Sequence, residues 1–244
     1  MKPMLTIAKR EYRAYFDSPL AYVVICLSLL MLGVWVFAGP RNFWQVDQAT
    51  LRSLFEAAPL GMVFLIVPVI TMRLVAEEKR SGTLEMLITL PVKDSEVILG
   101  KYLGALGLVL TLAASTLLYP ILMFKFPWHL GAIDWGPVAS GYLGIVLFAS
   151  AAVAVGLLVS SLTESQVIAF FVTFIVLVAL HWVGEIWQLV PNTLGVVLRE
   201  ISFREHYASF ERGVIDTTDV IFFLSCTALA LMLAFRALES RKWT

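Results

Sequence analysis

Six long stretches of the sequence contain no Asp, Glu, Lys or Arg, and they constrain the fold more than any other feature. They run over residues 18–40, 57–72, 102–124, 135–163, 165–184 and 220–235. A helix needs about 20 mostly apolar residues to cross the hydrocarbon core of a bilayer. The chain is therefore predicted to be an all-α membrane protein with six transmembrane helices, at about 19–39, 57–76, 100–124, 138–162, 165–184 and 217–236.

The composition excludes several other classes of protein. Apolar residues make up 59% of the 244 residues and charged residues 15%, whereas a soluble domain has about 45–50% apolar and about 25% charged residues. Both cysteines, Cys26 and Cys226, lie in apolar runs, so they are interpreted as packing residues. Eighteen basic and eighteen acidic residues cancel, which gives no global charge for binding nucleic acid.

The domain organisation follows from these runs. Residues 1–17 are predicted to form an amphipathic helix, and residues 18–244 a single six-helix domain. A seventh uncharged run, over residues 186–198, is too short to span and contains Pro191, Asn192 and Gly195. It is interpreted as a re-entrant or interfacial segment before the sixth span, within an outer loop at 185–216.

The distribution of Lys and Arg predicts the orientation. With both termini on one side, that side holds twelve basic residues and the other side holds six. Cytoplasmic loops of membrane proteins carry the excess of basic residues. Both termini are therefore expected to be cytoplasmic.

The first 17 residues have a helical apolar pattern. One face carries Arg10 and Arg13 together with Lys9, and the other face is apolar or aromatic. The apolar set is Met4, Leu5, Ala8, Tyr12, Tyr15 and Phe16. Such a helix suits the inner headgroup layer. It is either an ordinary basic anchor or an interface helix that contacts a cytosolic partner.

The loop at 77–99 is the most informative connection. It opens with the charged run Glu77-Glu78-Lys79-Arg80, and Ser81-Gly82-Thr83 follows as a helix-start pattern. Leu84, Leu87 and Ile88 then form a short apolar stripe, which Pro91 limits to about two turns. A helix this short is unstable alone and needs a surface to pack against. That surface is either the chain's own bundle or lipid, or else a groove of a soluble partner. The periodicity favours the two alternatives about equally.

Small residues predict close helix packing in two places. Gly100 and Gly104 form a small-xxx-small face at the start of the third span. The fourth span is rich in Gly, Ala and Ser, which favours tight packing within the subunit or across a dimer.

No catalytic or metal site is predicted. The only Gly-Lys pair, Gly100-Lys101, lacks the remainder of a phosphate-binding loop. His129, His181 and His206 are scattered and match no metal-ligand spacing. The interiors of the spans hold almost no ionisable groups, which argues against an ion-coupled carrier or a charge-lined channel.

The loop resembles that of the ABC type-2 permeases, the membrane subunits of a large class of ABC exporters. The matching motifs are Glu77-Glu78-Lys79, Gly82-Thr83-Leu84-Glu85, the run Leu87 to Leu90, Pro91-Val92, and Gly100-Lys101-Tyr102-Leu103-Gly104. The layout of the whole chain is also similar to this family. The stretch 203–224 is most similar to the gliding-motility-type branch.

The resemblance implies a division of labour. Two permease subunits, identical or different, would pair in the bacterial inner membrane, and each would dock a separate ATPase that binds ATP and Mg²⁺; this chain would hold no cofactor. A membrane-anchored auxiliary protein is a further expected partner. The coupling residues implied are Glu77, Glu78, Arg80, Gly82, Thr83, Glu85 and Leu87, with Arg10, Tyr12 and Arg13 on the interface helix.

Two other interpretations stay open at this point. The machine could transmit force to a periplasmic partner instead of passing a solute. Alternatively, the chain could be a partner-free membrane scaffold or channel whose 77–99 loop lies on lipid.

Overall fold

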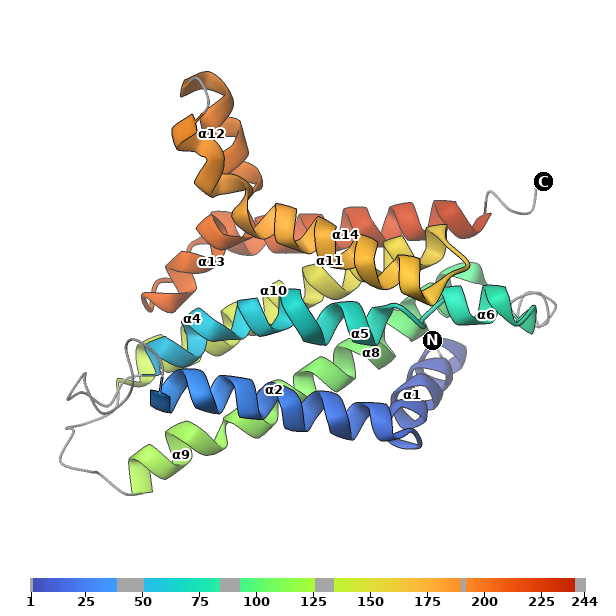
Figure 1. Cartoon of the computed structure of the whole chain (residues 1–244), viewed down its shortest axis with the longest axis horizontal. Helices are drawn as coiled ribbons and strands as arrows, with labels where there is room; N and C mark the ends of the chain where they lie inside the picture. The colour runs from blue at the N-terminus through green and yellow to red at the C-terminus, as the bar shows by residue number, and fades with distance from the viewer. Residues whose placement is uncertain (1, 39–50, 84–92, 126–133, 190–191, 240–244) are drawn as a thin grey trace.

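The computed structural model describes residues 2–38, 51–83, 93–125, 134–189 and 192–239, and within them it consists of helices joined by short turns. Six helical stretches are long and apolar enough to cross a membrane. They span Ala21–Ala38, Arg52–Arg80, Asp94–Ile121, Trp135–Leu162, Gln166–Ile186 and Thr217–Glu239. They lie side by side along the long axis of the molecule (Figure 1). The predicted all-α class with six spans is confirmed.

The chain begins with two helices that meet at a sharp break. Helix α1 (Lys2–Phe16) lies across one end of the bundle, and α2 (Pro19–Ala38) runs along it as the first span (Figure 1). Proline disfavours helix in the residue before it, which separates the two helices at Ser18. The first apolar span begins at Ala21, after this break, and the role of α1 as an interface helix stays a prediction.

The second span is irregular. It consists of α4 (Arg52–Gly61), a π-helical turn η1 (Met62–Ile66), α5 (Val67–Thr71) and, after a turn, α6 (Ala76–Arg80). Its helix begins at Arg52, five residues before the predicted start of the span, and Arg52 pairs with Glu56 at 3.2 Å one helical turn away. Proline at positions 59 and 68 removes backbone donors, which fits the departure from regular α-helix between them.

The third span also begins before its predicted start at residue 100. Helix α8 (Asp94–Thr116) continues after a short turn as α9 (Leu118–Lys125). At its start the Lys93 backbone N–H donates to Glu96 Oε2 at 3.2 Å, which satisfies a group that the first turn leaves free. The charged residues of this first turn therefore belong to the helix.

The fourth span, α10 (Trp135–Leu162), is the central helix of the bundle, and most of its side chains are buried. Its small residues admit large neighbours of the same chain. A Cβ at Gly141 would lie 2.6 Å from the Phe55 ring, and one at Gly144 would lie 2.6 Å from Phe210 Cβ. Of the two possibilities left open by the sequence, packing within the subunit is therefore the one observed for these positions.

The last part of the chain leaves the bundle and returns. Helix α11 (Gln166–Trp182) runs into the 3₁₀ helix η2 (Val183–Leu189), and α12 (Asn192–Ile201) projects sideways from the bundle (Figure 1). Helix α13 (Phe203–Glu211) turns back, and α14 (Thr217–Glu239) ends at the same end as α1. The re-entrant character of residues 186–198 stays a prediction.

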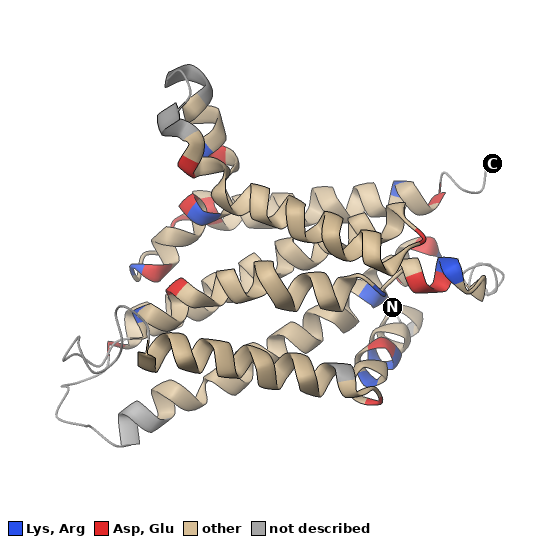
Figure 2. Ribbon diagram, viewed as in Figure 1, with Lys and Arg blue, Asp and Glu red and all other residues tan. Residues whose placement is uncertain are grey.

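The outer surface of the bundle suits a lipid environment. Much of α2, α11 and α14 is exposed, and exposed apolar side chains such as Leu30, Ile175 and Met232 lie on them. Charged side chains gather at the two ends of the bundle and leave its middle almost free of charge (Figure 2). This arrangement is typical of a helical integral membrane protein.

Candidate coupling interface

Helix α1 packs on the first turns of α8 along the predicted glycine face. A Cβ at Gly100 would lie 2.8 Å from Ile7 Cβ, and a Cβ at Gly104 would lie 2.6 Å from Glu11 Cβ. No side chain fits at either distance, so glycine lets the two helices approach closely. The small-xxx-small face therefore joins α8 to the N-terminal helix.

Two tyrosines fix α1 to the bundle. The Tyr12 hydroxyl lies 2.9 Å from Thr111 Oγ1 of α8, and the Tyr15 O–H donates to the Ile70 carbonyl of α5 at 2.9 Å. Burial raises the pKa of Tyr15 far above its usual value, so its hydroxyl stays protonated and remains a donor. The inward face differs from the predicted apolar set at one place, since Leu5 is exposed and Ile7 packs against α8.

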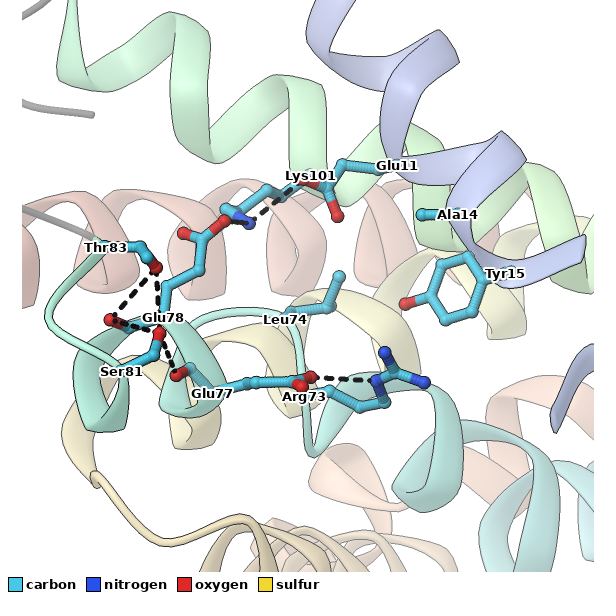
Figure 3. Close-up of a pocket in the computed structure, with 10 residues that line it drawn as sticks. All are labelled: Glu11, Ala14, Tyr15, Arg73, Leu74, Glu77, Glu78, Ser81, Thr83 and Lys101. Atoms are coloured by element: carbon cyan, nitrogen blue, oxygen red, sulfur yellow. Dashed lines mark hydrogen bonds and ion pairs between the residues drawn. The ribbon is translucent and has the colours of Figure 1, made fainter. Parts of the chain in front are cut away.

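A buried lysine connects three elements at this end. Lys101 of α8, whose side chain is 2% exposed, places Nζ 2.7 Å from Glu78 Oε1 of α6 and 3.2 Å from Glu11 Oε1 of α1. Figure 3 shows it between the two carboxylates. Arg10 extends the cluster, with Nη2 3.0 Å from Glu11 Oε1 and 3.9 Å from Glu78 Oε1. We call Lys101, Glu11 and Glu78 the lysine node.

A cavity of about 280 Å³ lies beside the lysine node (Figure 3). The node residues line it together with Tyr15, Arg73, Glu77, Ser81 and Thr83, among others. Arg73 Nε donates to Glu77 Oε2 at 3.0 Å, whereas Glu78 Oε2 has no hydrogen-bond partner within the described ranges. The cavity is therefore a polar recess in which α1 and the α5–α6 turn face each other.

Helix α6 is capped by a residue of another span. The turn before α6 leaves backbone N–H groups without helical partners, and those of Val75 and Ala76 donate to Ser160 Oγ of α10 at 3.1 and 3.2 Å. Lys79 adds a hydrogen bond to the Ser161 carbonyl. The short α6 is thus held against the central helix, which compensates for its length.

Helix α6 ends where the predicted coupling helix should begin. Gly82 has φ +70°, a left-handed conformation that costs other residues about 1–2 kcal/mol, and its N–H donates to the Lys79 carbonyl. The Ser81 hydroxyl donates to the Glu77 carbonyl and lies 2.9 Å from Thr83 Oγ1. The sequence around Gly82 thus ends helix α6 in a turn. Residues 84–92, where the predicted coupling helix lies, are outside the described residues.

The structure brings together some of the predicted site residues. Glu77, Glu78 and Thr83 line the cavity, and Arg10 reaches the lysine node. Tyr12 faces α8 rather than open surface, while Arg13 and Arg80 are exposed. Glu85 and Leu87 lie outside the described residues.

Sequence reasoning missed three residues of this region: Glu11, Lys101 and Ser160. Lys101 enters the sequence interpretation only through a motif and the count of cytoplasmic basic residues, although a lone Lys between two glycines of a packing face is itself a signal. Glu11 stands out as an acid in the otherwise basic polar face of α1. No local pattern marks Ser160, because Ser161 next to it is equally small and polar.

A comparison with protein families agrees with this architecture. The family model described as "ABC-2 family transporter protein" matches residues 49–237, which is more than three quarters of the chain. The chain belongs to the ABC-2 transporter family. It is thus a permease-type membrane protein, and the assignment to the gliding-motility-type branch stays a prediction.

Two curated relatives carry related descriptions. The "Probable multidrug ABC transporter permease YbhR" of Escherichia coli K12 is 30% identical over 136 residues, which cover 55% of this chain and 35% of that protein. The "Probable ABC transporter permease protein NosY" of Pseudomonas aeruginosa PAO1 is 33% identical over 118 residues, 46% of this chain and 42% of that protein. The matches thus span less than half the length of either relative.

Proposed function

We propose that this chain is the transmembrane permease subunit of an ATP-driven ABC exporter, or of a related machine that acts on periplasmic partners. It pairs with a second permease subunit in the bacterial inner membrane, with both termini in the cytoplasm. Each permease docks a separate ATPase, which binds ATP and Mg²⁺. A membrane-anchored auxiliary protein completes the assembly.

The lysine node is the observation that carries this proposal. It links α1, α6 and α8 at one point, and α6 leads through the Gly82 turn directly into residues 84–92. A partner that pushes on this loop would therefore transmit force to three spans at once. The force would reach the first span through α1, the second through α6 and the third through α8. Helices joined in this way shift as a unit between two packed arrangements.

The predicted site residues then take different roles. Glu77, Arg80, Gly82, Thr83, Glu85 and Leu87 form the docking loop, Arg10 and Arg13 extend it along α1, and Glu78 ties it to the lysine node. Gly100 and Gly104 keep α1 against α8. Catalysis resides in the ATPase.

Purification of the chain from its native membrane in mild detergent, followed by mass spectrometry and an ATPase assay, tests the proposal. An ATPase with a phosphate-binding loop is expected to co-purify at about one to one. Changing Gly82 and Glu85 together should remove it while the chain still inserts. The matched control is Arg236→Gln, because Arg236 is an exposed cation at the same end of the bundle, paired only with Glu239 in the described region.

Two outcomes would contradict the proposal. If the chain is recovered without an ATPase under conditions that preserve other complexes, the partner-free scaffold or channel becomes the better interpretation. If the Gly82 and Glu85 variant keeps its ATPase and its activity, docking does not involve the 77–99 loop. An ATP-dependent effect without any transported molecule would favour the machine that acts on periplasmic partners over the exporter.

A further inference from the structure

A buried histidine joins the α-helices that follow the fifth span. His206 of α13 is 8% exposed, and its Nδ1 lies 2.7 Å from Asp219 Oδ1 of α14. Its Nε2 lies 3.0 Å from the Glu200 carbonyl of α12. The ring also stacks on Phe222 of α14, with the two ring centroids 3.8 Å apart. One imidazole therefore ties α12 and α13 to the start of α14, near the end of the bundle opposite α1 (Figure 1).

Both groups that face the nitrogens of this ring are hydrogen-bond acceptors. A carboxylate oxygen faces Nδ1 and a carbonyl oxygen faces Nε2, whereas a neutral imidazole carries an N–H on only one nitrogen. With a neutral ring and an ionised Asp219, one ring lone pair would face an oxygen at hydrogen-bond distance, which is repulsive. The two hydrogen bonds can form together only if the pair holds one further proton, on either His206 or Asp219.

Burial makes the loss of this proton costly. Asp219 is 7% exposed, and its Oδ2 has no hydrogen-bond partner among the residues that the structure describes. Without the proton, a buried carboxylate would face a ring that can donate to only one of its two acceptors. The ring must then give up its hydrogen bond to Glu200 or its hydrogen bond to Asp219.

The contact with the Glu200 carbonyl helps to fix the angle at which α12 leaves the bundle. The joint is Ser202, whose hydroxyl donates to the His181 carbonyl at 3.2 Å. Arg199 of α12 also pairs with Glu205 of α13 at 3.4 Å, but both side chains are about half exposed, and exposed ion pairs contribute little to stability. Loss of the contact with His206 would therefore let α12 change its angle at Ser202.

We propose that the His206–Asp219 pair is a proton-binding site that latches α12 to the bundle and releases it as the pH rises. Histidine is the side chain that ordinarily changes charge between about pH 5 and 8. The released state holds one proton fewer than the latched state, so the ratio of released to latched chains should rise up to about tenfold per pH unit. The site would respond to the pH on the side of the membrane opposite the coupling interface, and it does not depend on the proposed ATPase.

Other titratable groups on the elements packed around α13 have partners or positions of their own. The ring of His181 on α11 contacts Phe148 and Trp182. The Glu200 side chain is exposed, and the phenols of Tyr142 and Tyr207 are neutral in this pH range, as phenols ordinarily are. The remaining charged groups form the ion pairs Arg52–Glu56, Arg199–Glu205 and Arg204–Glu185.

Glu211 at the end of α13 also changes charge in this range. Burial and the neighbouring Glu56 raise its pKa to about 7. Five residues after His206, it lies about 140° away around the helix, on a different face. Its contribution to any pH dependence can therefore be separated from that of the pair by substitution.

Electron–electron double resonance between spin labels on α12 and α14 tests the latch. The labels are placed at Val196→Cys and Leu229→Cys, where the native side chains are 61% and 55% exposed. The full chain, with Cys26→Ala and Cys226→Ala to remove its free cysteines, is reconstituted in nanodiscs. One narrow distance is expected at the acidic end of the range from about pH 5 to 8, and a second population should grow as the pH rises. A distance distribution that does not change over this range would overturn the proposal.

Asp219→Asn is the diagnostic variant, because its amide N–H can donate to Nδ1 as the protonated acid does, while Nε2–H donates to the Glu200 carbonyl. It should keep α12 latched over the whole pH range, whereas His206→Gln should release α12 over the whole range. Asp216→Asn is the matched control, since Asp216 is an exposed acid three residues earlier that accepts from the Thr218 N–H. It should leave the pH dependence unchanged.

Glu211→Gln should also leave the pH dependence unchanged. A pH response that persists in Asp219→Asn, or that disappears in Glu211→Gln, would show that the pair is not the proton-binding site. If the variants of the pair fail to fold, the pH series of the Glu211→Gln chain decides the matter, because a remaining response supports the latch and its absence refutes it.

Discussion

Replacing Lys101 with methionine should destabilise the packing of α1 and α6 on α8. The change keeps most of the side-chain volume but leaves Glu11 and Glu78 facing each other without the ammonium group between them. Breaking a buried ion pair by removing one partner costs about 3–5 kcal/mol. Arg10 lies 3.0 Å from Glu11 and remains as partial compensation, although it is largely exposed. The expected loss is therefore at the lower end, about 3 kcal/mol.

A double-mutant cycle in lipid bicelles measures this effect. The free energy of unfolding is compared for Lys101→Met, Glu78→Gln and the two changes combined. The combined variant should recover about 1–2 kcal/mol relative to the sum of the single changes, because it no longer holds a stranded charge. Arg236→Gln is the control, since an exposed ion pair contributes about 0–1 kcal/mol.

Two results would refute the reasoning about the lysine node. The first is a loss below about 1 kcal/mol for Lys101→Met, which would mean that water or Arg10 replaces the ammonium group. The second is strict additivity in the cycle, which would mean that Lys101 and Glu78 do not interact in the membrane.

Gly104→Ala should cost about 1–3 kcal/mol in unfolding free energy, because the new methyl group would lie 2.6 Å from Glu11 Cβ. Gly61→Ala is the control and should cost nothing, because its nearest neighbour would lie at 3.9 Å. Equal effects of the two changes would contradict the packing argument. Gly82→Ala should weaken ATPase co-purification about tenfold through its φ of +70°, and Gly82→Asn should weaken it less; an unaffected alanine variant would show that this conformation is not needed. Ser160→Ala leaves two N–H groups of α6 unpaired and should speed amide hydrogen exchange there, whereas unchanged exchange would mean that water replaces the hydroxyl.

The six spans could be predicted because apolar, uncharged runs about 20 residues long form few structures other than transmembrane helices. Their ends were less predictable, since the same criterion stops at the first charged residue. Arg52 and Glu56 pair along the helix, so the second span continues through both of them. Lys93 and Glu96 similarly close the first turn of α8. Local pairing of this kind is visible in the sequence only when charges are considered together with their helical spacing.

The candidate site was harder to predict because its contacts join distant parts of the chain. Lys101 contributes to the predicted excess of basic residues on the cytoplasmic side, as if it faced water or headgroups. Its side chain is instead buried between Glu11, ninety residues earlier, and Glu78, twenty-three residues earlier. A charged side chain near the end of a span can lie among lipid headgroups, in solvent or against a buried partner. The hydropathy of the sequence is the same in all three cases, so it does not distinguish them. What distinguishes the third case is the pair of glycines that flank the lysine, because Gly100 and Gly104 let α1 come close enough to bring Glu11 to Lys101.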